Sequence, residues 1–188
     1  MERPMSAPAQ ETTEDYLALD DAALLAQCDV NVHRASGPGG QHRNKVSSAV
    51  RLHHRPTGVS VQAYDSRGQH ENRRMALKRL RAKIACQVRR PAAPKAAPPE
   101  AVAACLFTPR KGPKGSPRRL QVGRKDGRFW AVAQHLLDLL DAHAGRLADA
   151  AASLGISTSN LAAVFREDRH LHAAAGQIRK RHGLGPLK

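Results

Sequence analysis

A change in hydrophobic periodicity near residue 65 constrains the fold of this 188-residue chain more than any other feature. Before it, apolar residues alternate with polar ones, as they do in strands that bury one face. Val50 and Leu52 form one such run, and Val59 and Val61 form the next after a Pro-Thr-Gly turn at residues 56–58. After it, apolar residues recur every three or four positions, as on a helix with one buried stripe. The pattern predicts a β-hairpin followed by a long helix packed on it.

A further strand and a short helix are expected before the hairpin. Val30 and Val32 alternate with polar residues over positions 29–34, and Asp20 or Asp21 could cap a helix over residues 22–27. Asp65 or Ser66 is the expected cap of the long helix, which has an apolar stripe and a basic opposite face. The stripe consists of Leu77, Leu80, Ile84 and Val88, and the basic face of Arg73, Arg74, Lys78, Arg81 and Arg89. Together these elements predict an α+β domain over residues 19–90.

The remaining segments differ in composition and periodicity. Residues 1–18 lack periodicity and are expected to be disordered. Residues 91–125 are rich in proline and basic side chains and predict a linker. Residues 126–188 return to helical spacing and predict a small α-helical domain with a basic tail.

One helical pair in this second domain has the spacing of a helix-turn-helix. Ala151 lies in the first helix, Gly155 in the turn and Leu161 in the second helix, for which Ser157 or Ser159 is the expected cap. Any tight helical hairpin has the same spacing, so simple packing and nucleic-acid docking both remain open. The second helix offers few basic residues, which counts against DNA recognition.

Positive charge is concentrated in the middle of the chain. The 31 basic and 16 acidic residues give a net charge of +15, distributed as −6 over residues 1–33, +12 over 34–90, +7 over 91–125 and +2 over 126–188. Such one-sided charge is self-repelling unless a polyanion neutralises it. A nucleic acid is therefore the expected partner.

Cysteine and histidine patterns argue against a metal site. Cys28, Cys86 and Cys105 are far apart in sequence and predict buried thiols in a reducing compartment. No histidine pairs with a cysteine at zinc spacing, so neither a metal nor another cofactor is expected. No apolar run is long enough to span a membrane, and the acidic N-terminal segment is unlike a transit peptide. We expect a cytoplasmic protein without a membrane partner.

The segment Ser36-Gly37-Pro38-Gly39-Gly40-Gln41-His42-Arg43-Asn44 carries the most unusual chemistry. Two adjacent glycines allow positive φ and a close approach to another surface. The glutamine amide then donates and accepts hydrogen bonds, with Arg34, Arg43 and Lys45 around it. The tripeptide alone is compatible with an ordinary surface turn. A cation-flanked amide also suits delivery into a phosphate-rich site.

In its wider context this segment resembles the catalytic loop of class I peptide chain release factors. Residues 48–52 and 54–59 are similar to the hairpin of that domain, and residues 65–73 to the start of its helix. The resemblance covers residues 28–90 in the same order and spacing. The rest of the chain is similar to a bacterial group of small release-factor-like proteins without a stop-codon-recognition domain.

The resemblance implies hydrolysis of the peptidyl-tRNA ester in the ribosomal peptidyl transferase centre. Gln41 would lie beside the ester, its backbone N–H stabilising developing negative charge and its side chain positioning water, while Gly39 and Gly40 permit that pose. The implied contacts with rRNA and tRNA are Arg34, Ser36, Gly37, Pro38, His42, Arg43, Asn44 and Lys45. Arg43 and Lys45 depart from the small apolar residue and threonine usual in full-length release factors.

Only about thirty residues precede the loop, too few for a codon-reading domain. We therefore expect codon-independent release, with the 23S-type rRNA of the large ribosomal subunit and the P-site peptidyl-tRNA as partners and a monomer off the ribosome. Candidates for contacts in the mRNA channel are Arg110, Lys111, Lys114, Arg118, Arg119, Arg179, Lys180 and Arg181. Two alternatives stay open: a non-catalytic ribosome- or rRNA-binding protein on the same fold, and a helix-turn-helix regulator.

Overall fold

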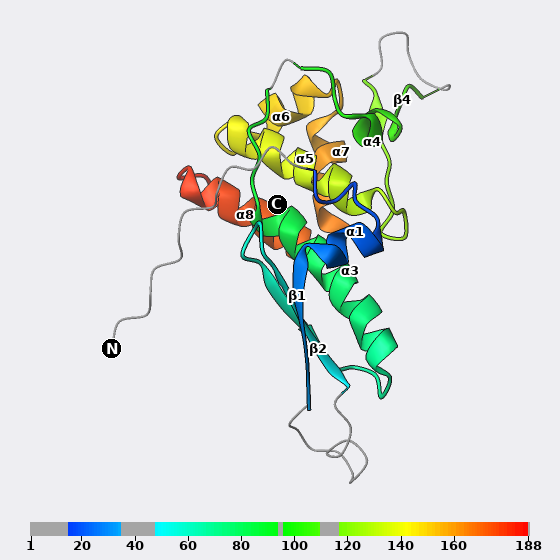
Figure 1. Cartoon of the computed structure of the whole chain (residues 1–188). Coiled ribbons are helices and arrows are strands. Elements are labelled where there is room, and N and C mark those ends of the chain that lie inside the picture. The colour runs from blue at the N-terminus through cyan, green and yellow to red at the C-terminus, as the bar shows by residue number, and fades with distance from the viewer. Residues whose placement is uncertain (1–14, 35–47, 94–95, 110–116, 188) are drawn as a thin grey trace. The chain divides into compact units, whose positions relative to one another are not determined.

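The computed structural model describes residues 15–34, 48–93, 96–109 and 117–187 (Figure 1). Its helices and strands are α1 (Asp21–Ala26), β1 (Cys28–His33), β2 (Ala49–His54), β3 (Ser60–Ala63), α3 (Gln69–Gln87), α4 (Glu100–Ala103), β4 (Leu106–Phe107), β5 (Arg119–Leu120), α5 (Phe129–Ala142), α6 (Leu147–Ser153), α7 (Thr158–Arg166) and α8 (Arg169–Arg181). They divide into two compact units, the first ending at Ile84 and the second beginning at Ala85, both within α3.

The first unit contains a three-stranded antiparallel sheet in the order β1-β2-β3. Val50 of the central strand lies opposite Val32 of β1 and Ala63 of β3. Val50 and Ala63 are fully buried, whereas Val32 is 37% exposed and its neighbour Val30 is 40% exposed. The strand expected over residues 29–34 is therefore present, shifted by one residue, but it forms the edge of the sheet and leaves its valines in contact with solvent.

Helix α3 runs along this sheet and buries the predicted stripe (Figure 1). Leu77, Leu80 and Ile84 are each 6% exposed or less. Val88, predicted for the same stripe, is also buried but follows the end of α3 at Gln87 and belongs to the second unit. Two basic side chains join the helix to β3. Lys83 Nζ donates to the backbone oxygen of Ser60 at 2.8 Å, and Arg79 Nη1 donates to the backbone oxygen of Gln62 at 2.7 Å. The small sheet and long helix confirm the predicted α+β class.

Residues 15–18, which precede α1 and were expected to be disordered, have a defined structure. We expected disorder up to residue 18, but residues 15–18 form a turn in which Tyr16 and Leu17 are buried. Arg81, predicted to lie on the basic face of the long helix, is half-buried, and its guanidinium donates to the backbone oxygens of Leu17 and Leu19 at 3.2 and 2.7 Å. The aspartate cap of α1 is confirmed, as Asp20 Oδ1 accepts from the N–H of Ala23 at 2.7 Å.

The second unit has one hydrophobic core shared by α4 to α8 and the two-stranded β4–β5 sheet. Its largest fully buried side chains lie in the region where the sequence shows helical spacing: Phe129, Leu136, Leu137, Leu140, Leu161, Phe165 and Leu171. Parts of the segment expected to be a linker also enter this core, namely Val102, Leu106, Leu120 and Val122. Runs of two to four residues are too short to reveal a period, which is why the composition suggested a linker.

A tight turn joins α6 and α7. Gly155 has φ +66°, a left-handed conformation that favours glycine. Ser157, rather than Ser159, caps α7 by accepting from the N–H of Asn160 at 3.2 Å. The side chain of Asn160 then bonds both the N–H and the oxygen of Leu120, at 2.7 and 3.0 Å. The predicted helical hairpin is thus present and is tied to β5.

A buried ionic cluster joins the start of the second unit to α5. Arg89, predicted for the basic face of the long helix, follows the end of α3 and donates from Nη1 to Asp138 Oδ1 at 2.8 Å. The Arg90 N–H donates to the same oxygen at 3.2 Å. The Asp138 side chain is only 2% exposed. Burial raises the pKa of Asp138 to about 6, against the opposing effect of the two guanidinium groups. No helix among the described residues is long and apolar enough to cross a membrane.

Candidate functional site

The predicted catalytic residues connect two strands that the structure describes. Gly39, Gly40 and Gln41 lie outside the described residues, as do the other loop candidates Ser36, Gly37, Pro38, His42, Arg43, Asn44 and Lys45. β1 ends at His33 and β2 begins at Ala49, and these two residues lie opposite each other in the sheet. The Gly-Gly-Gln segment is therefore inserted between two paired antiparallel strands, whose pairing brings its two ends together.

Asn72 ties the start of β2 to the start of α3. Its Nδ2 donates to the oxygen of Ser48 at 2.7 Å and to that of Ser66 at 2.8 Å, while its Oδ1 accepts from the Ser66 N–H at 2.8 Å. The Asn72 side chain is fully buried, so these hydrogen bonds take the place of the bonds that its amide would otherwise make to water. Asn72 lies within the segment that resembles a release-factor domain, but no pattern in the sequence indicates this role.

We expect Asn72→Ala to lower the free energy of unfolding by about 2–3 kcal/mol. The change removes the side-chain partner of backbone groups of the half-buried residues Ser48 and Ser66, and a group left without a partner away from water costs about 1–3 kcal/mol. Urea denaturation of the full chain measures the effect. Asn31→Ala, an exposed position on β1, is the matched control and should stay within about 0.5 kcal/mol of wild type. Equal stability of the two variants would contradict the anchoring role.

Exposed cations occur on the segments that flank this junction. Arg34 follows β1, Arg51 lies in β2, and Arg67 precedes α3, all exposed. Arg74, on α3, is exposed too but pairs with Glu71 at 2.9 Å. Their charge favours the approach of a polyanion to this part of the first unit.

The basic residues proposed for the mRNA channel are in different environments. Arg110, Lys111 and Lys114 lie outside the described residues. Arg118 and Arg119 are exposed at β5, and Lys180 is exposed on α8. Arg181 pairs with Asp141 at 3.3 Å. Arg179 is half-buried and donates to the oxygens of Gly185 and Gly145 at 2.8 and 2.9 Å, so part of its role is structural.

The three cysteines are free thiols, and the described residues contain no cluster of potential metal ligands. Cys28 and Cys105 are buried, Cys86 is half-buried, and all three are free thiols. Burial raises the pKa of each, to about 11 for Cys86, so they remain protonated at neutral pH. Within the described part of the chain, no three His, Cys, Asp or Glu side chains gather as a metal site.

Comparison with known proteins shows which protein family the region around this junction matches. Residues 24–104 match the family model of the RF-1 domain. Among curated relatives, peptide chain release factor 2 of Buchnera aphidicola subsp. Baizongia pistaciae (strain Bp) is 48% identical over 73 residues, and that of Acidovorax sp. (strain JS42) is 57% identical over 73 residues; each match covers 37% of this chain and 20% of the relative. Peptide chain release factor 1 of Acidiphilium cryptum (strain JF-5) is 52% identical over 68 residues, 36% of this chain and 19% of the relative. The chain thus matches about a fifth of the length of these relatives.

Proposed function

Because residues 24–104 are an RF-1 domain, the Gly-Gly-Gln-containing catalytic domain of peptide chain release factors, we propose that this protein hydrolyses peptidyl-tRNA on the ribosome. The observation that carries the proposal is an intact Gly39-Gly40-Gln41 in the matched region, between β1 and β2. A non-catalytic relative would have no need to keep this tripeptide.

In this proposal Gln41 acts at the ester that joins the nascent peptide to tRNA. Its backbone N–H donates to the oxygen on which negative charge develops as water attacks, a contribution typically worth about 10²–10³ in rate. Its side-chain amide orients the water and excludes larger nucleophiles. Gly39 and Gly40 allow the backbone to approach rRNA closely. The exposed cations near the junction neutralise rRNA phosphates.

We further propose that release does not depend on the codon in the A site. The similarity to full-length release factors covers only 73 residues of this chain. After the matched region, which ends at residue 104, the structure describes the helices α5 to α8. This arrangement favours rescue of stalled ribosomes over termination at stop codons.

Peptide release from ribosomes with a labelled peptidyl-tRNA in the P site tests the proposal. Three complexes differ only in the A site, which is empty on truncated mRNA, holds a stop codon, or holds a sense codon. We expect fastest release on truncated mRNA and no advantage of the stop codon over the sense codon. Release confined to the stop-codon complex would contradict codon independence, and no release from any complex would contradict the catalytic function.

The basic segment around β5 gives a separate prediction. Neutralising Arg110, Lys111, Lys114, Arg118 and Arg119 together is expected to weaken ribosome affinity and to flatten its salt dependence, since each lost phosphate contact lowers the logarithmic salt slope by about 0.7–0.9. Binding is measured by co-sedimentation at several salt concentrations. The release rate at saturating protein is the control and should not change. An unchanged affinity and slope would show that these residues make no ribosome contact.

A further inference from the structure

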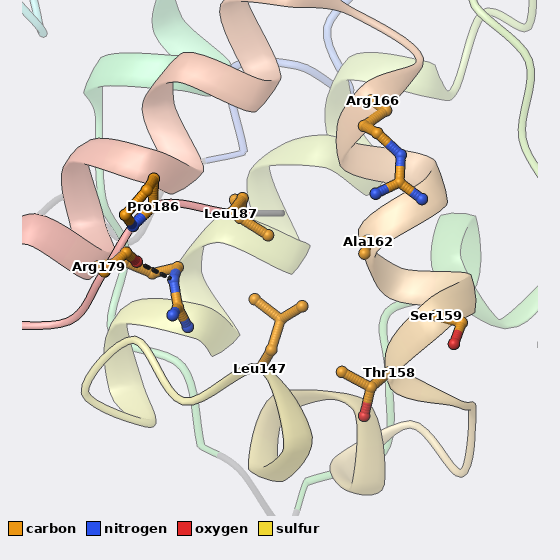
Figure 2. Close-up of a pocket in the computed structure, with 9 residues that line it drawn as sticks. Leu147, Thr158, Ser159, Ala162, Arg166, Arg179, Pro186 and Leu187 are labelled. Carbon is orange, nitrogen blue, oxygen red and sulfur yellow. Dashed lines mark hydrogen bonds between the residues drawn. The ribbon is translucent and has the colours of Figure 1, made fainter.

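The polar side chains around a pocket in the second unit are already engaged or turned away from it (Figure 2). The Arg179 guanidinium donates to the oxygens of Gly185 and Gly145, and the hydroxyl groups of Thr158 and Ser159 point away from the cavity. Unused bonding capacity lies instead at one edge of the β1-β2-β3 sheet in the first unit.

The two edges of this sheet differ in how their outward backbone groups are bonded. On β3, the oxygens of Ser60 and Gln62 accept from Lys83 and Arg79 at 2.8 and 2.7 Å. These cationic side chains close the β3 edge against another strand. β1, at the other edge, has neither proline nor lysine, and its six residues pair with β2 without a bulge. These common protections of an edge strand are therefore missing from β1.

The hydrogen bonds of the β1–β2 ladder show which backbone groups of β1 face outward. The Arg55 N–H donates to the Gln27 oxygen at 3.1 Å, immediately before the first pair of the ladder. Because bonded and non-bonded pairs alternate in an antiparallel ladder, the N–H and oxygen of Val30 and Val32 point away from β2. No hydrogen bond to these outward groups is found in the part of the chain that the structure describes, and both valine side chains are exposed.

We propose that β1 pairs with β1 of a second copy of this chain, antiparallel and in register about Asn31. In this register Val30 lies opposite Val32 of the partner subunit, and the two residues exchange both of their outward backbone hydrogen bonds. Asp29 lies opposite His33 of the partner subunit, which can donate a hydrogen bond to it, rather than opposite a second carboxylate. The strand is therefore complementary to itself in its backbone, its apolar side chains and its polar side chains.

The same register extends the apolar rows of the sheet across the dimer axis. Val61, Leu52 and Val30 form one row over β3, β2 and β1, in which the first two are buried and Val30 is exposed. The row continues with Val32 and Val50 of the partner subunit, so each exposed valine gains an apolar neighbour. A strand of an unrelated protein would pair with the same backbone groups but need not match these side chains, which favours a second copy.

Sedimentation velocity of the full-length protein over a range of concentrations tests this pairing. The interface is only one strand wide, so we expect a weak dimer whose fraction rises with concentration, in place of the monomer expected from the sequence. Val32→Lys should weaken self-association at least about tenfold, because a charge replaces an apolar contact in the interface. Gln62→Lys adds the same charge to an exposed position on β3 and should leave self-association unchanged.

A cysteine on the dimer axis tests the register. Asn31 lies opposite Asn31 of the partner subunit as a non-hydrogen-bonded pair, in which Cα atoms are about 4.5 Å apart, within the range that a disulfide spans. Asn31→Cys should therefore give a disulfide-linked dimer on a non-reducing gel after oxidation with copper–phenanthroline. Gln62→Cys is the matched control, because Gln62 is exposed on the same face of the sheet. That variant and the wild type, whose cysteines are buried or half-buried, should not crosslink.

Three results would each overturn the proposed dimer. They are a monomer at every concentration, equal self-association of the folded Val32→Lys and Gln62→Lys variants, and equal crosslinking of Asn31→Cys and Gln62→Cys. Circular dichroism establishes that each variant is folded. Because the assays contain no ribosome and the Gly-Gly-Gln segment takes no part in the pairing, failure of the dimer leaves the proposed peptidyl-tRNA hydrolysis standing.

Discussion

Gln41→Ala is expected to abolish peptide release from ribosomes stalled on truncated mRNA while ribosome binding persists. The substitution removes the amide that orients water, and Gly40→Ala adds a side chain where the proposed mechanism needs close backbone approach to rRNA. We expect a loss of at least about 10² in the release rate for each variant. Single-turnover release of a labelled peptide, at protein concentrations that saturate the ribosome, measures this rate apart from affinity.

Gln62→Ala is the matched control, because Gln62 is an exposed glutamine on β3 whose backbone oxygen, not its side chain, accepts from Arg79. It should release peptide at the wild-type rate. Co-sedimentation should show equal ribosome binding for all variants. Undiminished release by Gln41→Ala or Gly40→Ala would refute the catalytic assignment. Loss of binding together with release would instead indicate that the loop serves affinity.

The largest effect on stability is expected at the buried ionic cluster. Asp138→Ala should lower the free energy of unfolding by about 3–5 kcal/mol, because it leaves the Arg89 and Arg90 side chains buried without their carboxylate. Urea denaturation at pH 7 measures the change. Asp149→Ala is the control: it breaks a solvent-exposed pair with Arg146 and should leave the stability close to that of the wild type. A similar cost for both would mean that burial adds nothing to the importance of Asp138.

The pH dependence provides a second measurement for the same carboxyl group. The pKa of Asp138 is about 6 in the folded protein, above its ordinary value of 3.8, so the folded state binds this proton more tightly. This tighter proton binding adds to the free energy of unfolding in full below about pH 4, and the contribution is lost as the pH rises through about 6. The alanine variant lacks this contribution. The destabilisation caused by Asp138→Ala should therefore grow as the pH falls from about 6 to about 4.

Local patterns in the sequence predicted much of the fold. The three- and four-residue spacing of Leu77, Leu80 and Ile84 identified the buried face of α3, and small polar residues identified the caps of α1 and α7. Such features depend on residues within a few positions of each other, so a single sequence contains them. The Gly-Gly-Gln motif identified the candidate catalytic residues only together with its wider context, the resemblance of residues 28–90 to a release-factor domain.

Features that depend on distant residues were not predictable. Arg89 resembles any exposed base on a helix until Asp138, 49 residues later, is placed beside it. Asn72 bonds Ser48, 24 residues earlier, and nothing in its neighbours indicates that contact. Val30 and Val32 have the alternation of a half-buried strand, but they are exposed even though Leu52 and Val50, opposite them on β2, are buried. In each case the deciding partner is set by tertiary structure, which no local pattern encodes.

The state of the three cysteines has a practical consequence for labelling. Since their thiols are buried or half-buried and have raised pKa values, they react slowly with maleimides near neutral pH, where only the thiolate attacks. A cysteine introduced at an exposed position, such as Gln62 on β3 or Lys180 on α8, would have an ordinary pKa and react first. A fluorophore can thus be attached at a chosen position of either unit without first removing the native cysteines.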